Sequence, residues 1–143
     1  MYVVDASVWV SRFVVGDVRH EPSRLWLAAL VQSDAAIAAP ALLLPEVAGA
    51  IARRSGRPEL AMQALSLLQR LPHMRLVSID ADLAQRAGRL AADLGLRGAD
   101  AVYVSLAHQL GVPLVTWDRE QRERSAASIE VLQPPRSPGT RRW

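Results

Sequence analysis

Short apolar runs alternate along the whole chain with longer segments in which apolar residues recur at helical spacing. The short runs predict strands over residues 2–6, 35–39, 75–79, 113–117 and 129–132. The longer segments predict helices over residues 7–15, 22–31, 41–53, 58–70, 80–94 and 98–110. Alternation of this kind is typical of a mainly parallel sheet, so we expect an α/β fold with about five strands. Two of the helices follow each other directly, which predicts a helical hairpin beside the sheet.

The chain has 143 residues, half of them apolar, which is enough for a single domain with a sizeable core. We expect this domain to span residues 1–132. Residues 133–143 read QPPRSPGTRRW, a proline-rich, basic C-terminal tail without periodicity, which we expect to be flexible. An arm that binds phosphates is the alternative interpretation of this tail.

The sequence contains no cysteine, which excludes disulfides, thiolate nucleophiles and metal sites built on sulfur. The charge-free stretch over residues 35–45 is too short to span a bilayer, and the N-terminal residues lack the features of a secretion signal. We therefore expect a cytoplasmic protein that does not enter a membrane. All 17 basic residues are arginine, but three of them lie at the C-terminus, which leaves 14 arginines against 14 acids elsewhere. Charge alone therefore does not predict nucleic-acid binding.

Four acidic residues stand where predicted strands end or predicted helices begin. Asp5 and Asp118 follow the first and fourth apolar runs, whereas Glu46 and Asp100 lie in the first turns of apolar helices. Asp5 has an ordinary explanation as a helix N-cap, although Ser7 is the better cap candidate. Glu46 and Asp100 could likewise be exposed acids favoured by the helix dipole. All four positions, however, belong to the carboxyl edge of a parallel sheet, where functional groups collect.

Four carboxylates in a small volume repel one another unless a cation lies among them. All-oxygen ligands, without cysteine or a well-placed histidine, point to Mg²⁺ or Mn²⁺ and not to zinc. Such ions orient a phosphodiester, lower the pKa of an attacking water and stabilise the leaving oxygen. The pattern therefore favours a metal-dependent reaction at a phosphate ester.

The segments that contain these acids are Asp5-Ala-Ser, Leu44-Pro-Glu46-Val, Leu96-Arg-Gly-Ala-Asp100-Ala-Val-Tyr-Val-Ser-Leu-Ala and Leu114-Val-Thr-Trp-Asp118. In order and context they resemble the four acidic motifs of PIN-domain ribonucleases, and the overall pattern is most similar to the VapC toxins of VapBC toxin–antitoxin modules. The resemblance covers residues 1–132. It departs from the family at Trp117, where a smaller residue is more common, and we expect this indole to lie in the core or the site wall.

The resemblance implies a three-layer α/β/α sandwich and metal-dependent endonucleolytic cleavage of RNA, leaving a 5′-phosphate and a 3′-hydroxyl. The residues that would bind one or two divalent ions and carry the catalysis are Asp5, Glu46, Asp100 and Asp118. Ser7 and Thr116 match the family's supporting hydroxyls beside the first and last acids. The family also implies a homodimer, and a VapB-like antitoxin whose C-terminal segment lies in the toxin's groove.

Several other polar residues receive a weaker assignment. Glu120, two residues after Asp118, is a candidate for a further metal ligand or for holding a water. Asp80 and Asp82 are explained as a helix cap and a dipole-favoured acid. The arginines considered for a phosphate contact are Arg12, Arg97 and Arg119.

Other classes of protein also gather acids at the edge of a parallel sheet. Phosphoacceptor receiver domains and phosphatases of the haloacid-dehalogenase type both use a lysine there, and this chain has none. A PIN-like fold that binds a partner without catalysis stays open as the alternative function. Cleavage of DNA in place of RNA also stays open, because the sequence does not show a residue that would recognise the 2′-hydroxyl.

Overall fold

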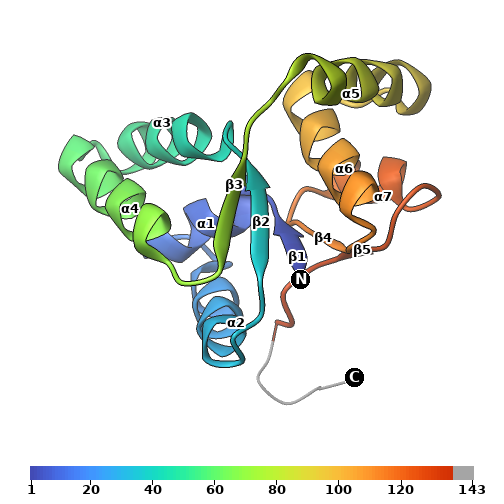
Figure 1. Cartoon of the computed structure of the whole chain (residues 1–143). Coiled ribbons are helices and arrows are strands. Elements are labelled where there is room, and N and C mark those ends of the chain that lie inside the picture. Colours follow the sequence, from blue (N-terminus) through green and yellow to red (C-terminus); the bar gives the residue numbers. More distant parts are fainter. Residues whose placement is uncertain (137–143) are drawn as a thin grey trace.

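A five-stranded parallel sheet forms the centre of the computed structural model, which describes residues 1–136 (Figure 1). The strands are β1 (Tyr2–Val4), β2 (Ile37–Pro40), β3 (Met74–Val77), β4 (Leu114–Val115) and β5 (Val131–Leu132). Their order across the sheet is β3-β2-β1-β4-β5, and every neighbouring pair is parallel. The α/β prediction with five strands is therefore confirmed.

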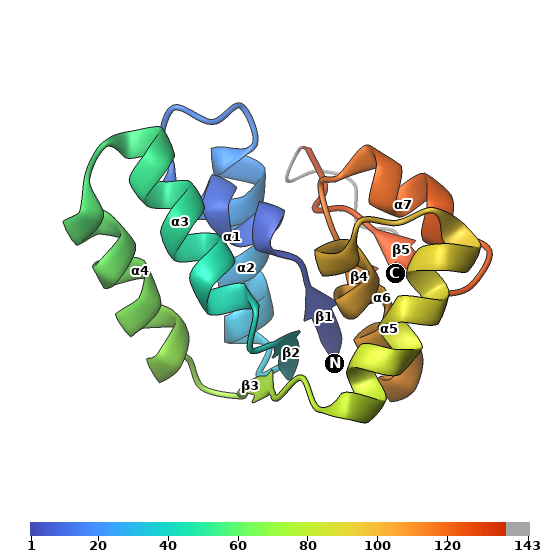
Figure 2. The same ribbon diagram turned by 90° about the horizontal axis from the view of Figure 1, so that it is seen from above.

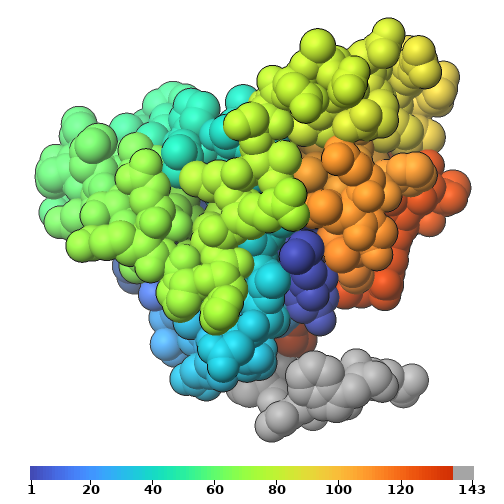
Figure 3. All heavy atoms as spheres, viewed as in Figure 1, coloured from blue at the N-terminus to red at the C-terminus, as the bar shows by residue number. Residues whose placement is uncertain are grey.

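Seven helices of the described residues surround this sheet. They are α1 (Ala6–Phe13), α2 (His20–Gln32), α3 (Leu43–Ser55), α4 (Pro58–Arg70), α5 (Ala81–Leu94), α6 (Gly98–Leu110) and α7 (Arg119–Ser125). Figure 2 shows α1 to α4 on one side of the sheet and α5 and α6 on the other, which confirms the three-layer arrangement. In the space-filling view, the predicted α3–α4 hairpin and the α5–α6 pair form two lobes on either side of β3 (Figure 3).

The core lies where both faces of the central strands are covered. Val3, Val4, Ile37 and Leu114 are fully buried, as the continuous apolar runs predict for a parallel sheet. Tyr103, in the middle of α6, is also fully buried although it carries a hydroxyl. A buried hydroxyl needs a hydrogen-bond partner, so the surroundings of Tyr103 are relevant to the site described below.

The helix α7 is absent from the sequence prediction. Its segment, Arg-Glu-Gln-Arg-Glu-Arg-Ser, contains no apolar residue, and the side chains that it buries are those of Gln121 and Ser125. A search for apolar periodicity cannot find such a helix. The local signals for it are Asp118 as N-cap, whose side chain accepts a hydrogen bond from the Gln121 N–H, and basic residues in the last turn.

The parallel register brings the carboxyl ends of β1 and β4 together. Val4 is opposite Val115, and the Asp5 N–H donates to the Val115 carbonyl at 3.0 Å. Beyond this point β1 leads into α1, and β4 continues through Thr116 to α7.

No helix in the described residues is long and apolar enough to cross a membrane. Residues 137–143, most of the predicted tail, lie outside the described part of the chain.

Candidate active site

Asp5 lies at the end of β1 and is the N-cap of α1, with 6% of its surface exposed. Its Oδ2 accepts hydrogen bonds from the Ser7 N–H at 2.9 Å and from the Thr116 hydroxyl at 3.2 Å. The sequence-based preference for Ser7 as the cap is therefore wrong. Asp5 takes this role because its extended backbone lies just before the first turn and its carboxylate reaches the free N–H groups there.

Burial raises the pKa of the Asp5 carboxyl, and the negative charge of Asp118 raises it further. The hydrogen bonds from Ser7 and Thr116 act in the opposite direction, but burial has the larger effect. Capping and metal binding are compatible roles, since both of these bonds fall on Oδ2.

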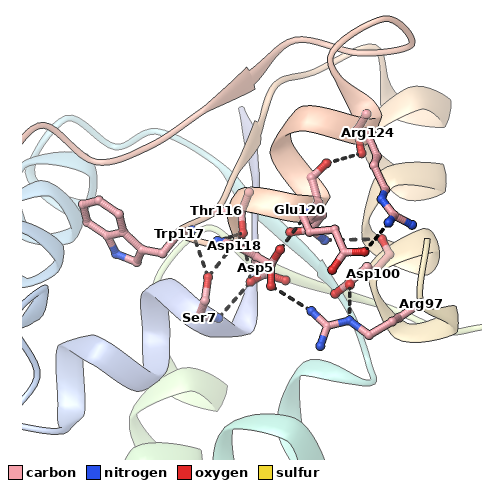
Figure 4. A network of polar contacts seen from close by, with 11 residues as sticks. Asp5, Ser7, Arg97, Asp100, Thr116, Trp117, Asp118, Glu120 and Arg124 are labelled. Atoms are coloured by element: carbon pink, nitrogen blue, oxygen red, sulfur yellow. Dashed lines mark hydrogen bonds and ion pairs between the residues drawn. The ribbon is translucent and has the colours of Figure 1, made fainter. Parts of the chain in front are cut away.

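The two predicted supporting hydroxyls meet beside Asp5. Ser7 Oγ and Thr116 Oγ1 are 3.3 Å apart, and each also accepts a backbone N–H, from Trp117 and Asp118 respectively, at 3.0 Å. These bonds join the start of α1 to the loop that follows β4 (Figure 4). The hydroxyls therefore fix the relative position of the first and last acids.

Glu46 lies in the first turn of α3 and accepts a 2.7 Å hydrogen bond from the Tyr103 hydroxyl through Oε2. Burial raises the pKa of Glu46, and the charges of Asp5 and Asp100 raise it further, whereas the Tyr103 bond lowers it. Tyr103 is a site residue that the sequence analysis missed. The available signal was its position one helical turn after Asp100, on a helix that is otherwise apolar there.

Asp100 and Asp118 share one cation, Arg97. Arg97 Nε donates to Asp100 Oδ2 at 3.0 Å, and its Nη2 donates to Asp118 Oδ2 at 2.8 Å (Figure 4). Burial raises the pKa of Asp100, as do the charges of Asp5 and Asp118, while Arg97 lowers it. The Arg97 side chain is 67% exposed, so it bridges the two acids from the solvent side.

The other residues considered from sequence fall into three groups. Glu120 forms an ion pair with Arg124 at 2.6 Å and is half-exposed beside the acids. Asp80 caps α5, as predicted. Two of the three candidate arginines have other contacts: Arg12 lies over the Phe13 ring, and Arg119 pairs with Glu123.

A cavity of about 430 Å³ opens at this edge of the sheet. Asp5, Glu46 and Asp100 line it together with Ser7 and Arg97. Asp118 is not among the lining residues, but it accepts a hydrogen bond from the same arginine. The structure thus places three of the predicted acids in the lining of one cavity and the fourth, Asp118, beside it through Arg97, from four different elements of the fold.

The chemistry of the donor set fits a hard divalent cation, because it offers carboxylate and hydroxyl oxygens. In the described residues no three acids are close enough to form a complete set of metal ligands. The Arg97 guanidinium instead supplies the positive charge for Asp100 and Asp118. An ion that bound here would take over that role from Arg97.

Comparison with known families matches residues 2–126 to the PIN domain. The chain therefore belongs to the PIN domain family. No curated protein sequence matches it significantly.

Several solved structures share its fold. One is VapC20 of Mycobacterium tuberculosis, described as a toxin that cleaves the sarcin–ricin loop, with a TM-score of 0.73 and 22% identity over 90% of this chain and 96% of that chain. Another is VapBC2 of Rickettsia felis bound to promoter DNA, with a TM-score of 0.70 and 16% identity over 92% and 97% of the two chains. A third is FitAcB of Neisseria gonorrhoeae, with a TM-score of 0.66 and 19% identity over 94% of this chain and 98% of that chain. At these identities the likeness concerns the fold.

Proposed function

We propose that this protein is a metal-dependent endoribonuclease and the toxin of a type II toxin–antitoxin module. The observation that carries the proposal is that Asp5, Glu46 and Asp100 line one cavity of a PIN domain and that Arg97 joins Asp118 to Asp100 beside it. Burial is the main cause that raises the pKa of Asp5, Glu46 and Asp100, and the charge of at least one neighbouring acid adds to it in each case, which supports a functional site here. Solved structures with the same fold include a toxin and a toxin–antitoxin complex.

In this mechanism the four acids would hold Mg²⁺ or Mn²⁺, one ion or two, and the ion would supply polarisation of the phosphodiester and a lower pKa for the attacking water. Ser7 and Thr116 orient Asp5 by hydrogen bonds to its carboxylate. Tyr103 holds Glu46 in the same way from α6. Arg97, once released from the acids, keeps its positive charge at the cavity, where it can contact a phosphate oxygen.

The test is incubation of the purified chain, freed of bound partners, with total cellular RNA in Mg²⁺, in Mn²⁺ and in EDTA. The Asp100→Asn variant removes one ligand, while Asp82→Asn makes the same charge change at an exposed position on α5. We expect discrete fragments with 5′-phosphate ends from the parent chain and from Asp82→Asn, and no fragments from Asp100→Asn or in EDTA. Circular dichroism would establish that all three proteins are folded.

Intact RNA in every lane, together with no heat of Mg²⁺ binding by calorimetry, would refute the nuclease. That result would favour the alternative of a PIN domain that binds a partner without catalysis. If Asp100→Asn cleaves RNA at the parent rate, the nuclease proposal stands, but Asp100 is not a residue of its active site.

The proposal extends to three further properties. We propose a VapB-like antitoxin as the protein partner, a homodimer as the active form and the cytoplasm as the compartment. Growth arrest on expression of the chain, relieved by co-expression of the neighbouring gene product, would support the antitoxin. Light scattering of the purified chain would measure the oligomeric state.

A further inference from the structure

The cavity beside the acids has a second end of opposite charge. Its lining there includes three arginines: Arg53 and Arg54 on α3, and Arg19 in the loop between α1 and α2, next to Asp17. None of these three was among the arginines that the sequence suggested. We call this cavity the groove, and the part of it that these three arginines line the arginine end.

Arg53 shares a face of α3 with Glu46, since Glu46, Ala50 and Arg53 follow helical spacing and all line the cavity. Its guanidinium lies back over Gly49, where an added Cβ would be 3.0 Å from Nη1. The charge of Arg53 is thus directed one turn toward Glu46. In the described part of the chain Arg53 forms no ion pair, so its charge is available to a ligand.

Arg19 and Arg54 are each held by a neighbour. The Arg19 guanidinium lies 5.4 Å from the centroid of the Trp117 ring, and Trp117 is buried and fixed by a 2.8 Å bond from its Nε1 to Ser23. Arg54 pairs with Asp17 at 2.8 Å. A guanidinium has five N–H donors, so an arginine held by a ring or one carboxylate can still bind a phosphate.

The unusual tryptophan is part of the core and also contacts one of these arginines. The Arg19 guanidinium lies over its ring, while its indole N–H is satisfied inside the protein. A small residue at position 117 would leave Arg19 without this support. This contact connects the end of β4, beside the acids, with the arginine end.

We propose that the arginine end binds the sugar–phosphate backbone of the RNA next to the phosphate held at the acids, and that Trp117 positions Arg19 for this contact. The inference rests on the proposed nuclease function and adds the residues that position its substrate. Phosphates recur at regular spacing along a nucleic-acid strand, so a strand with one phosphate at the acids places others along the groove. An acidic protein segment fits less well, because its carboxylates would add negative charge beside Asp5, Glu46 and Asp100, where the charge of Arg97 is already shared between two acids.

The experiment measures binding separately from cleavage. In an Asp100→Asn background with EDTA, a short fluorescein-labelled single-stranded RNA of mixed sequence is titrated with the full chain at several salt concentrations. The variants are Arg19→Gln, Arg53→Gln and the pair together. The control is Arg89→Gln, an exposed arginine on α5 away from the cavity.

We expect each groove variant to weaken binding several-fold and to reduce the slope of log K against log salt by about 0.7, the value for one lost phosphate contact on a single strand. Arg89→Gln should keep the affinity and the slope of its background. In the otherwise unaltered chain, the groove variants should raise KM and leave kcat within about twofold. Trp117→Leu should reproduce the Arg19→Gln effect and add nothing to it when the two are combined.

An unchanged salt slope in the double variant would overturn the inference. If the parent chain still cleaves RNA in that case, the nuclease proposal stands and only the arginine end is wrong. If the double variant instead loses binding to oligoglutamate while keeping RNA binding, this end belongs to a protein partner. A parent chain that neither binds nor cleaves RNA would overturn both proposals.

Discussion

The Tyr103→Phe substitution tests whether Glu46 is held in place by one buried hydroxyl. The ring of Tyr103 is fully buried and remains in the phenylalanine variant, so packing changes little. The 2.7 Å hydrogen bond to Glu46 Oε2 is lost. The variant therefore separates the orientation of one acid from the rest of the core.

The expected size of the effect follows from the burial of the two partners. A hydrogen bond to a charged group contributes about 1.5–3 kcal/mol to stability. Glu46 is only half-buried and faces the cavity, so water can replace part of the lost bond. We expect a loss of about 1–1.5 kcal/mol in the free energy of unfolding, which corresponds to roughly 3–6 °C in Tm for a chain of this size. Cleavage should fall by about 10–100-fold, as for other residues that orient metal ligands.

The assay combines urea unfolding with a pH profile of RNA cleavage. The Tyr103 bond lowers the pKa of Glu46, so its removal should move the acidic limb of the profile to higher pH. A purely structural role would not move this limb. Tyr2→Phe is the matched control, because the Tyr2 ring packs edge-on against Trp26 at the opposite end of β1. A Tyr103→Phe protein with the stability and pH profile of Tyr2→Phe would refute the role of the hydroxyl.

Two further predictions concern the charges of the acids. The pKa of Asp5 is higher in the folded protein than in the unfolded chain. The stability that Asp5 contributes is therefore fully present below its unfolded pKa and is lost as pH rises through its folded pKa. The loss is about 1.4 kcal/mol for each pKa unit between the two states. Because Asn also caps helices, Asp5→Asn should have a higher free energy of unfolding than the parent at neutral pH and lose this advantage near pH 4, roughly the unfolded pKa of Asp. Urea unfolding that gives the same difference in free energy at both pH values would contradict this prediction. Arg97→Gln removes the cation shared by Asp100 and Asp118, so it should lower metal-free stability and tighten Mg²⁺ binding several-fold by calorimetry, whereas weaker binding would mean that Arg97 helps to shape the site.

The sequence predicted the parallel sheet and its helical layers because their signals are local. The central strands are continuous apolar runs, and six of the seven helices of the described part have an apolar face. The seventh helix, α7, buries Gln121 and Ser125 against the end of the sheet and has no such face. This helix depends on the local Asp118 cap and on tertiary contacts such as the bond from the Gln121 side chain to the Asp100 carbonyl. The second bond joins residues 21 positions apart, so a local pattern in the sequence does not reveal it.

The candidate acids could be found from sequence for a topological reason. Strand ends and the following helix starts meet at one edge in a parallel sheet, which explains why Asp5, Glu46 and Asp118 were expected together before any distance was known. Asp100 begins α6, which follows α5 and not a strand, so its place beside them depended on the resemblance to PIN domains. The contacts that refine the site depend on distances between elements remote in sequence. Tyr103 reaches Glu46 across 57 positions. The choice of Asp5 over Ser7 as the cap depended on which side chain faces the first turn, which composition does not determine.

The four acids are held by two kinds of support, and the difference bears on how an ion would enter. Asp5 and Glu46 receive their hydrogen bonds from groups fixed in the fold, the start of α1 and the buried Tyr103. Asp100 and Asp118 are joined by the exposed side chain of Arg97, whose several rotatable bonds allow it to leave without disturbing the core. Repulsion among the acids disfavours the site without a cation, and Arg97 offsets part of that repulsion at the solvent side. Entry of a metal ion would therefore exchange one cation for another at Asp100 and Asp118, while Asp5 and Glu46 keep the positions that the fold gives them.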